Sequence, residues 1–283
     1  MKDGLAIWHY PHRTLVENVR YFAENGYNAV SVHGAHMDEA CRQPEIAEEL
    51  AKLVAKYQLT LTVHHKLPGS HKEEDVAAYR ESIDYFAQWQ KENGTLAILS
   101  FDVADAIRDN VMPYITYALE KVPGSKIAVE DFGLTGAEKI QIEPLKAEPR
   151  FGYLLDIGHM FLRIRGENTD GYTLFCNQED ECPKCDDPGY EEFLQAFRSK
   201  EFPVFEIHLH NNDGLKDKHW FLEEGKLNIA AVAAVLETMG WDGVLTIESA
   251  PGYTFPCYGE DADMGIAKTF EYWKKLRKEV SKS

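Results

Sequence analysis

Hydrophobic and polar residues along the chain follow two periods that alternate with one another. Short apolar or alternating runs, such as LTLTV at residues 59–63, predict strands. Longer runs with apolar residues every three or four positions predict helices at about residues 14–26, 44–57, 73–92, 102–122, 190–198 and 263–280. The predicted strands, in chain order, cover residues 5–8, 28–32, 59–63, 96–99, 126–129, 153–155, 204–209 and 244–247.

Eight strands that alternate with helices are typical of a closed (β/α)8 TIM barrel, an α/β fold that commonly uses about 250 residues. A doubly wound open sheet has a similar element order, but the strand count and the length of 283 residues favour the barrel. No repeat or low-complexity tract divides the chain, so we expect a single domain over residues 1–283. A polar, Gly- and Asp-rich stretch at about residues 165–189 predicts a loop insertion on the catalytic face.

Composition and charge narrow the class of protein. The hydrophobic fraction of 44% and the aromatic fraction of 12% indicate a globular chain. No apolar window approaches about 18 residues and no signal peptide is recognisable, so we expect a cytoplasmic protein without a membrane partner. The net charge of -17 repels nucleic acid, which counts against a nucleic-acid partner, although a bound divalent ion could reverse the field locally.

Three cysteines lie within the predicted insertion, at Cys176, Cys182 and Cys185. Cys-x-x-Cys is half of a structural zinc site, and the upstream cysteine would add a third ligand, with Cys257 as a conceivable fourth. Free thiols in a loop would have the same spacing. A second, structural zinc ion therefore stands as one of two interpretations.

Titratable side chains stand at the end of nearly every predicted strand. In a (β/α)8 barrel these ends meet on the catalytic face. The residues concerned are His9, His33, His64, His65, Asp102, Glu130, Asp156, His159, His208, His210 and Glu248. Imidazole and carboxylate groups bind divalent ions such as zinc, manganese and cobalt. One such residue alone is usually a hydrogen-bonded surface group, but their convergence on one face predicts a metal-dependent active site.

Four motifs in strand order resemble the xylose isomerase-like barrel superfamily. That superfamily holds sugar isomerases and epimerases, inosose dehydratases and the endonuclease IV branch of abasic-site nucleases. The motifs are IAVED with Glu130, LLDIGHM with Asp156 and His159, HLHNNDG followed by Asp217 and His219, and GVLTIES with Glu248. The resemblance spans the whole chain and implies the barrel fold, but it does not specify the reaction.

The resemblance implies one divalent metal ion, manganese, cobalt, magnesium or zinc, held by Glu130, Asp156, His210 and Glu248. We align His210 with the family ligand because the run HNND that begins there matches the family's His-x-Asn/Lys-Asp run. His208 then becomes a neighbouring pocket residue.

The resemblance to ketose epimerases implies catalytic roles for Glu130 and Glu248. One would act as base and the other as acid, moving a proton through an enediolate. Substrate would be bound by His64, His159, His208, Asp217 and His219. The sequence therefore predicts an isomerase or epimerase of a small sugar or sugar phosphate in carbohydrate metabolism.

Other functions stay open. The same pocket would suit a polyol dehydratase of the inosose type or a metal-dependent hydrolase of the endonuclease IV type, in which the residues matching His159, Asp217 and His219 hold a further zinc. The nuclease branch has a histidine at the end of the fourth strand, where this chain has Asp102. A barrel that only binds a sugar or a protein has no need of such ligands. Barrels of this kind often form homodimers, which we expect here by analogy alone.

Overall fold

A computed structural model describes residues 1–6, 13–94, 96–131, 142–167, 194, 197–198, 202–213, 217–249 and 262–282. From residue 168 onward the predicted insertion lies outside these residues, and Cys176, Cys182 and Cys185 lie there too. The structural zinc site and the extent of the domain therefore stay predictions.

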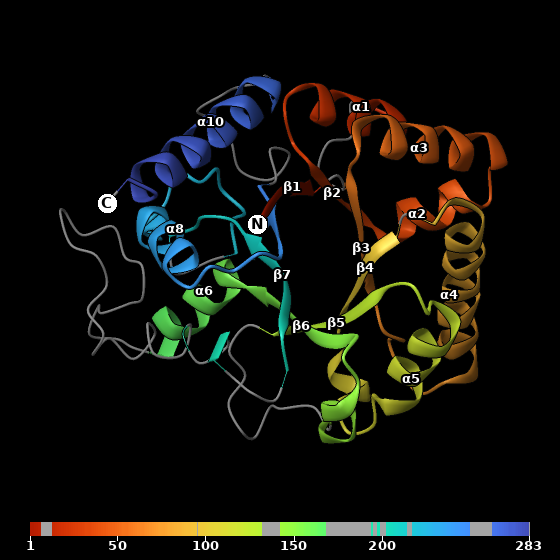
Figure 1. Ribbon diagram of the computed structural model, residues 1–283. Helices are drawn as coiled ribbons and strands as arrows, with labels where there is room; N and C mark the ends of the chain where they lie inside the picture. Colours follow the sequence, from red (N-terminus) through yellow and green to blue (C-terminus); the bar gives the residue numbers. More distant parts are fainter. Residues whose placement is uncertain are drawn as a thin grey trace.

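Eight parallel strands close into a barrel in chain order (Figure 1). They are β1 (Lys2–Ala6), β2 (Ala29–His33), β3 (Thr60–Lys66), β4 (Leu96–Asp102), β5 (Lys126–Asp131), β6 (Phe151–Asp156), β7 (Val204–Leu209) and β8 (Val244–Ile247). The last strand pairs with the first, with Leu245 opposite Asp3, so the sheet has no open edge. This closure confirms the predicted TIM barrel and excludes the doubly wound sheet.

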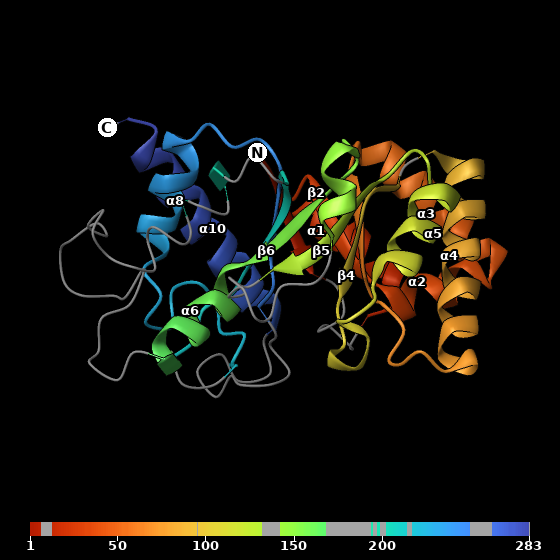
Figure 2. The ribbon, with the colours of Figure 1, turned by 90° about the horizontal axis from the view of Figure 1, so that it is seen from below.

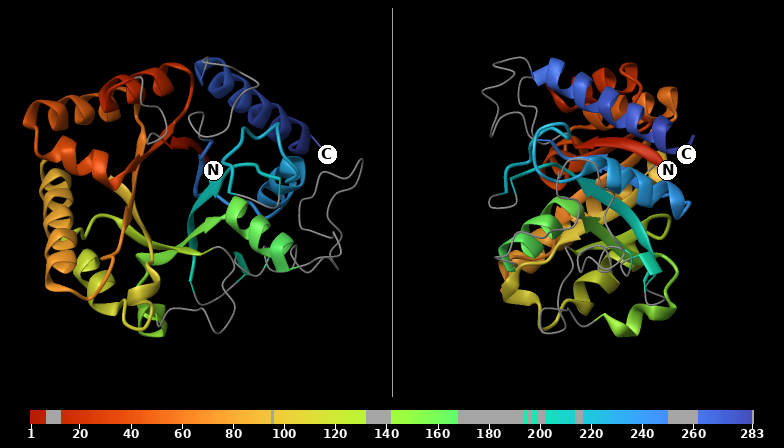
Figure 3. Two further views of the ribbon diagram at one scale, coloured as in Figure 1. Left: turned by 180° about the vertical axis from the view of Figure 1, so that it is seen from behind. Right: turned by 90° about the vertical axis from the view of Figure 1, so that its left-hand side faces the viewer.

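Helices surround the barrel (Figures 2 and 3). They are α1 (Leu15–Glu24), α2 (Gly34–Cys41), α3 (Pro44–Tyr57), α4 (Glu73–Asn93), α5 (Met112–Lys121), α6 (Ile157–Glu167), α8 (Ile229–Thr238) and α10 (Ala262–Val280), with short 3-10 turns η1 (Asp105–Ile107) and η2 (Glu143–Ala147). In Figures 1 and 2, α4 lies on the opposite side of the barrel from α8 and α10. No helix in the described residues is both long and apolar enough to span a membrane.

Local signals explain several helix ends. Thr14 and Glu17 form a capping box at the start of α1, and Pro44 occupies the first turn of α3. A helix over residues 102–122 has to bend or begin afresh at Pro113, because proline suits a first turn and not a helix interior. Helix α5 begins there, at Met112. Gly94, with a φ of 66°, ends α4.

Three described helices, α2, α6 and α8, were not predicted. Helix α2 has 8 residues, too few to show a period. Helix α6 begins directly after β6, with no turn sequence between them. Helix α8 reads IAAVAAVLET, which is apolar almost all round and therefore lacks the polar face that marks an amphipathic helix.

The interior of the barrel is layered. Near the amino ends of the strands a small apolar cluster fills it, made of Ala29, Ile98, Ala128, Leu154, Phe205 and Val244. Successive inward-facing residues of a strand are two apart. Two residues further along β2, β4, β5, β6 and β8 the inward positions are polar, namely Ser31, Ser100, Glu130, Asp156 and Thr246. On β7 the inward polar residue is Glu206, which directly follows Phe205. The apolar layer thus supports a polar layer at the carboxyl ends.

Helix α10 fastens the end of the chain to β1, as Figure 3 shows. The buried Trp273 donates from Nε1 to Asp3 Oδ1 at 2.9 Å, and Arg277 donates to Asp3 Oδ2 at 2.9 Å. The indole also belongs to the main apolar core between strands and helices. The carboxylate of Asp3 therefore links the first strand to the last helix.

We expect Trp273→Ala to lower the free energy of unfolding by about 3–5 kcal/mol, because the indole is fully buried and its removal leaves a cavity and takes one hydrogen bond from Asp3. Equilibrium unfolding in urea measures this loss. The matched control is Lys274→Ala, which alters an exposed ion pair with Glu271 and should change the free energy by less than about 0.5 kcal/mol. Equal effects of the two variants would contradict the role given to α10.

Candidate active site

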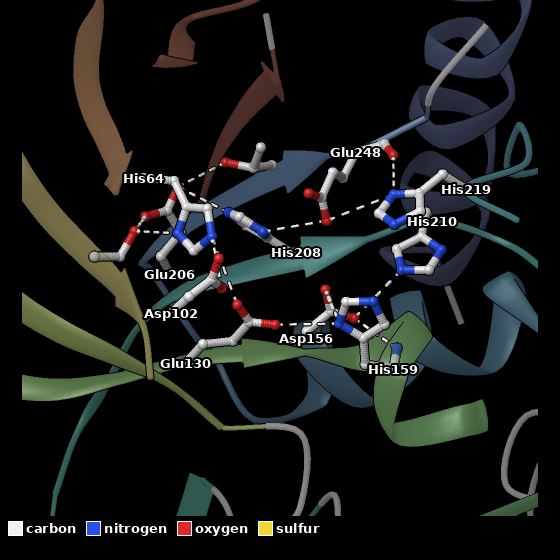
Figure 4. A network of polar contacts seen from close by, with 12 residues as sticks. His64, Asp102, Glu130, Asp156, His159, Glu206, His208, His210, His219 and Glu248 are labelled. Carbon is white, nitrogen blue, oxygen red and sulfur yellow. Dashed lines mark hydrogen bonds and ion pairs between the residues drawn. The ribbon is translucent and has the colours of Figure 1, made fainter. Parts of the chain in front are cut away.

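The carboxyl ends of the strands bring a dense set of carboxylates and imidazoles together (Figure 4). They come from β3, β4, β5, β6, α6, β7 and the segments after β7 and β8. The residues are His64, Asp102, Glu130, Asp156, His159, His208, His210, Asp217, His219 and Glu248. Every metal, catalytic or substrate-binding residue predicted from the sequence for this face therefore lies in one network.

A first group of potential metal ligands lies at the ends of β3, β4 and β5. His64 Nε2 lies 3.2 Å from Asp102 Oδ1 and 3.5 Å from Glu130 Oε2. The other ring nitrogen, Nδ1, lies 3.1 Å from the hydroxyl of Ser100. Asp102 stands at the strand end where the nuclease pattern has a histidine, and its carboxylate belongs to this first group.

A second group joins Asp156, His208 and Glu248, and all three side chains are buried. His208 Nδ1 lies 3.2 Å from Glu248 Oε2. In the sheet, Asp156 is the register partner of His208, and His208 is the register partner of Thr246. The stagger of β6, β7 and β8 therefore sets this group.

A third group holds His159, His210, Asp217 and His219. His159 Nε2 lies 3.2 Å from Asp217 Oδ2, and His219 Nε2 lies 3.1 Å from Asp217 Oδ1. The ring of His210 stacks on that of His219, with centroids 3.8 Å apart. His159 also bridges to the other groups, because its Nδ1 lies 3.1 Å from both Glu130 Oε1 and Asp156 Oδ2.

The backbone of His219 has a φ of 47°, in the left-handed region that residues with a side chain seldom adopt. This conformation lets Nδ1 donate to the carbonyl oxygen of Glu248 at 2.9 Å. Nε2 is then the nitrogen that faces Asp217. Strained backbone of this kind concentrates at functional sites.

His208, in β7, and His210, directly after it, belong to different ligand groups in the structure. The alignment placed His210 with Glu130, Asp156 and Glu248, whereas Asp156, His208 and Glu248 are the residues whose potential ligand atoms lie within 4.8 Å of one another. His210 lies one pleat further along, with Nε2 3.5 Å from Asp156 Oδ1, and it groups with the third set. The sequence alignment rests on the run HNND that begins at His210, and a motif match does not include the distances between side chains.

Sequence reasoning missed Glu206. This residue of β7 is fully buried and accepts hydrogen bonds from Thr62 and Thr246, both at 2.8 Å. A signal was present, because Glu206, His208 and His210 are spaced by two along a strand and therefore share one face.

The two glutamates predicted to be catalytic have opposite electrostatics. Burial raises the pKa of Glu130 to about 8, and the neighbouring Asp102 carboxylate adds to this. Burial would also raise the pKa of Glu248, but the charges of His208 and His219 outweigh it and hold the pKa at about 2. Burial lowers the pKa of His210, so its ring is neutral and suited to bind a metal.

The donor set fits a bound divalent cation. Asp156 Oδ2 and Glu248 Oε2 have imidazole nitrogens at 3.1 and 3.2 Å. Within the described part of the chain, however, neither oxygen and neither ring nitrogen of His210 makes a well-aligned hydrogen bond, although all four atoms are buried. Buried polar atoms are otherwise almost always hydrogen-bonded, so such atoms call for another partner. Converging carboxylate and imidazole groups of this kind coordinate divalent metals.

Comparison with known proteins agrees with this architecture. The family model of the xylose isomerase-like TIM barrel matches residues 19–276. The chain belongs to this family. The match confirms the resemblance inferred from the four motifs.

Among its relatives, the uncharacterized protein MJ1311 of Methanocaldococcus jannaschii is 23% identical over 273 residues, covering 88% of this chain and 84% of that protein. The solved structure of a D-tagatose 3-epimerase-like protein superposes with a TM-score of 0.69 at 20% identity, covering 100% of this chain and 99% of that one. The D-psicose 3-epimerase of Clostridium cellulolyticum H10, solved with D-tagatose, has a TM-score of 0.59 at 12% identity, covering 98% and 99%. At these identities the similarity shows the fold.

Gly158 at the start of α6 is required by the approach of His210, because a Cβ there would lie 2.2 Å from His210 Nε2. We expect Gly158→Ala to destabilise the protein by about 1–3 kcal/mol through this clash. Without the clash the substitution would stabilise the helix by about 0.5–1 kcal/mol. Urea unfolding distinguishes the two signs.

The matched control is Gly69→Ala, whose added Cβ would meet nothing closer than 3.7 Å. It should leave the free energy of unfolding unchanged or slightly raised. A stabilising effect of Gly158→Ala would show that His210 does not occupy this position.

Proposed function

We propose that this family member is a divalent-metal-dependent isomerase or epimerase of a small sugar or sugar phosphate. The observation that carries the proposal is the pair of buried carboxylates, Glu130 and Glu248, which belong to one network of carboxylates and imidazoles (Figure 4). Moving a proton to and from a carbon next to a carbonyl requires a base and an acid in one enclosed site.

The metal would be held by Asp156, His208 and Glu248, with Glu130 beside them. This is the predicted ligand set with His208 in place of His210. When bound, a divalent ion supplies positive charge that polarises a carbonyl oxygen and stabilises the enediolate formed by proton loss. The mostly oxygen donor set suits manganese, cobalt or magnesium as well as zinc.

The carboxylates themselves would transfer the proton. Glu130 lies in β5 and Glu248 directly follows β8, so the two carboxylates come from different parts of the barrel mouth. One would remove a proton from one face of the substrate, and the other would return it to the opposite face. Their different surroundings keep one ionised and let the other retain a proton, which is the usual basis of paired acid and base roles. His64, His159 and His219, whose rings border the two carboxylates, would bind substrate hydroxyls.

The similarity to sugar 3-epimerase structures supports this assignment at the level of fold. The net charge of -17 supports a small substrate over a nucleic acid. These observations leave the identity of the sugar to experiment.

A second function, metal-dependent hydrolysis of the endonuclease IV type, is favoured by one observation. Three ligand groups lie side by side, and a fourth set made of Glu130, Asp156 and His159 connects them. Adjacent metal ions can clamp the attacking and leaving oxygens of a displacement. Metal stoichiometry separates the two functions, because the isomerase needs one ion and the hydrolase needs two or three.

We expect the purified protein to contain one tightly bound divalent ion per chain, measured by elemental analysis after dialysis. His208→Ala should lose this ion, because it removes the imidazole grouped with Asp156 and Glu248. His71→Ala, which removes an imidazole paired with Asp109 outside this network, is the matched control and should retain the ion. Retention in His208→Ala with loss in His210→Ala would favour the alignment made from the sequence. Two or three ions that are lost together would favour the hydrolase, whereas a zinc ion retained by both variants would point to the predicted cysteine site.

We expect Glu130→Gln and Glu248→Gln each to lower turnover by about 10²–10⁴-fold, because each removes one partner in proton transfer. The assay follows deuterium incorporation from D₂O into a panel of ketoses and ketose phosphates, in the presence of manganese. Glu120→Gln, on the exposed face of α5, is the control and should keep full activity. Wild-type turnover without deuterium exchange would exclude proton transfer through solvent-exchanging carboxylates.

A further inference from the structure

Glu206 lies in the barrel interior at a place where no metal or substrate role has been assigned. Its side chain is 0% exposed, and it belongs to none of the ligand groups among the described residues. Hydroxyl groups from three other strands point at it. Thr62 and Thr246 donate to Oε1 at 2.8 Å, and Ser100 donates to Oε2 at 3.4 Å.

A buried carboxylate is costly to the fold. An apolar side chain of similar size would serve stability at least as well, as the apolar layer beneath it shows. The carboxylate therefore calls for a role that an apolar residue cannot perform. The direction of its contacts identifies that role.

An ionised carboxylate only accepts hydrogen bonds, so each group that faces it presents a proton. His208 Nε2 lies 3.7 Å from Glu206 Oε1. This places the Nε2 proton toward Glu206. In the neutral ring that binds a metal, the lone pair on Nδ1 is then directed at the second ligand group, where Glu248 Oε2 lies 3.2 Å away.

The same argument extends to His64 through Ser100. The Ser100 hydroxyl shares its one proton between Glu206 Oε2 and the carbonyl oxygen of Val63, each at 3.4 Å. The hydroxyl oxygen therefore accepts from His64 Nδ1, 3.1 Å away. His64 Nε2 carries the lone pair and faces the first ligand group.

We propose that Glu206 is a positioning residue that orients two imidazoles of the site, His208 by direct contact and His64 through Ser100. It selects the ring nitrogen that each histidine presents to the site, Nδ1 of His208 to the cation and Nε2 of His64 to the substrate. Partners that fix the orientation of a metal-ligating histidine in this way raise metal affinity by about 10–100-fold. The inference rests on the proposed metal-dependent function and adds a residue to it.

The first test uses the wild-type protein loaded with zinc and labelled with ¹⁵N-histidine. Nuclear magnetic resonance should show a protonated Nε2 and a coordinated Nδ1 for His208, assigned by comparison with His208→Ala. Coordination through Nε2 would overturn the inference. This readout requires no substitution of Glu206, so it stands even if that variant does not fold.

The second test measures zinc affinity by calorimetric titration of the metal-free protein. Glu206→Gln should weaken binding by about 10–100-fold, because the amide can no longer accept on both oxygens and cannot orient both rings. Thr246→Val is the matched control, since it removes one hydroxyl from the same buried cluster but leaves the carboxylate facing His208. Its affinity should stay within about threefold of wild type.

Thermal unfolding of the metal-free variants separates positioning from simple structural support. If Glu206 has only a structural role, Glu206→Gln lowers the melting temperature and leaves zinc affinity unchanged. That result would overturn this inference but not the proposed function. A wild-type protein that binds no zinc, manganese or cobalt would overturn both this inference and the proposed function.

Discussion

The structure of the site depends on a single constraint, which is that ionised groups held away from water must be matched by donors or by opposite charge. Asp156, Glu206 and Glu248 are fully or almost fully buried. Each lies against an imidazole, and Glu206 also receives hydroxyl donors from neighbouring strands. The acidic groups and histidines therefore form one network in which no member is independent of the others.

The closed barrel makes such a network feasible. Parallel strands place their carboxyl ends on one face, and closure between β1 and β8 lets side chains from distant parts of the chain meet across the interior. The apolar layer near the amino ends supplies a rigid floor. Above it the inward positions change to hydroxyl and carboxyl groups, so the transition from core to site occurs within a single strand.

Chemically equivalent side chains acquire different properties from their positions in this network. Glu130 lies beside another carboxylate and retains its proton more strongly, whereas Glu248 lies beside two histidines and stays ionised. The contrast supports different roles in proton transfer under the proposed function. A bound cation would favour the ionised form of both groups, which ties the acid and base chemistry to metal binding.

The sequence by itself determined the barrel and the face on which the site lies. These are local features: the strand and helix periods alternate eight times, and titratable residues stand at the strand ends. Both can be recognised in the sequence without knowing which residues are in contact. Helix α8 was not predicted, because an apolar sequence without a polar face shows no helical period. The motifs around Glu130, Asp156 and Glu248 were equally local, and they were sufficient to identify the family.

Only the tertiary structure decided that His208 groups with Asp156 and Glu248, and that Glu206 lies beneath it. The period of a strand shows which side a residue faces, and Glu206, His208 and His210 all face the same side. Their depth in the barrel depends on the stagger between β6, β7 and β8, which no single strand encodes. Hydrogen bonds to Thr62 and Ser100, from strands more than 100 residues away, then complete a network that exists only when the sheet has closed.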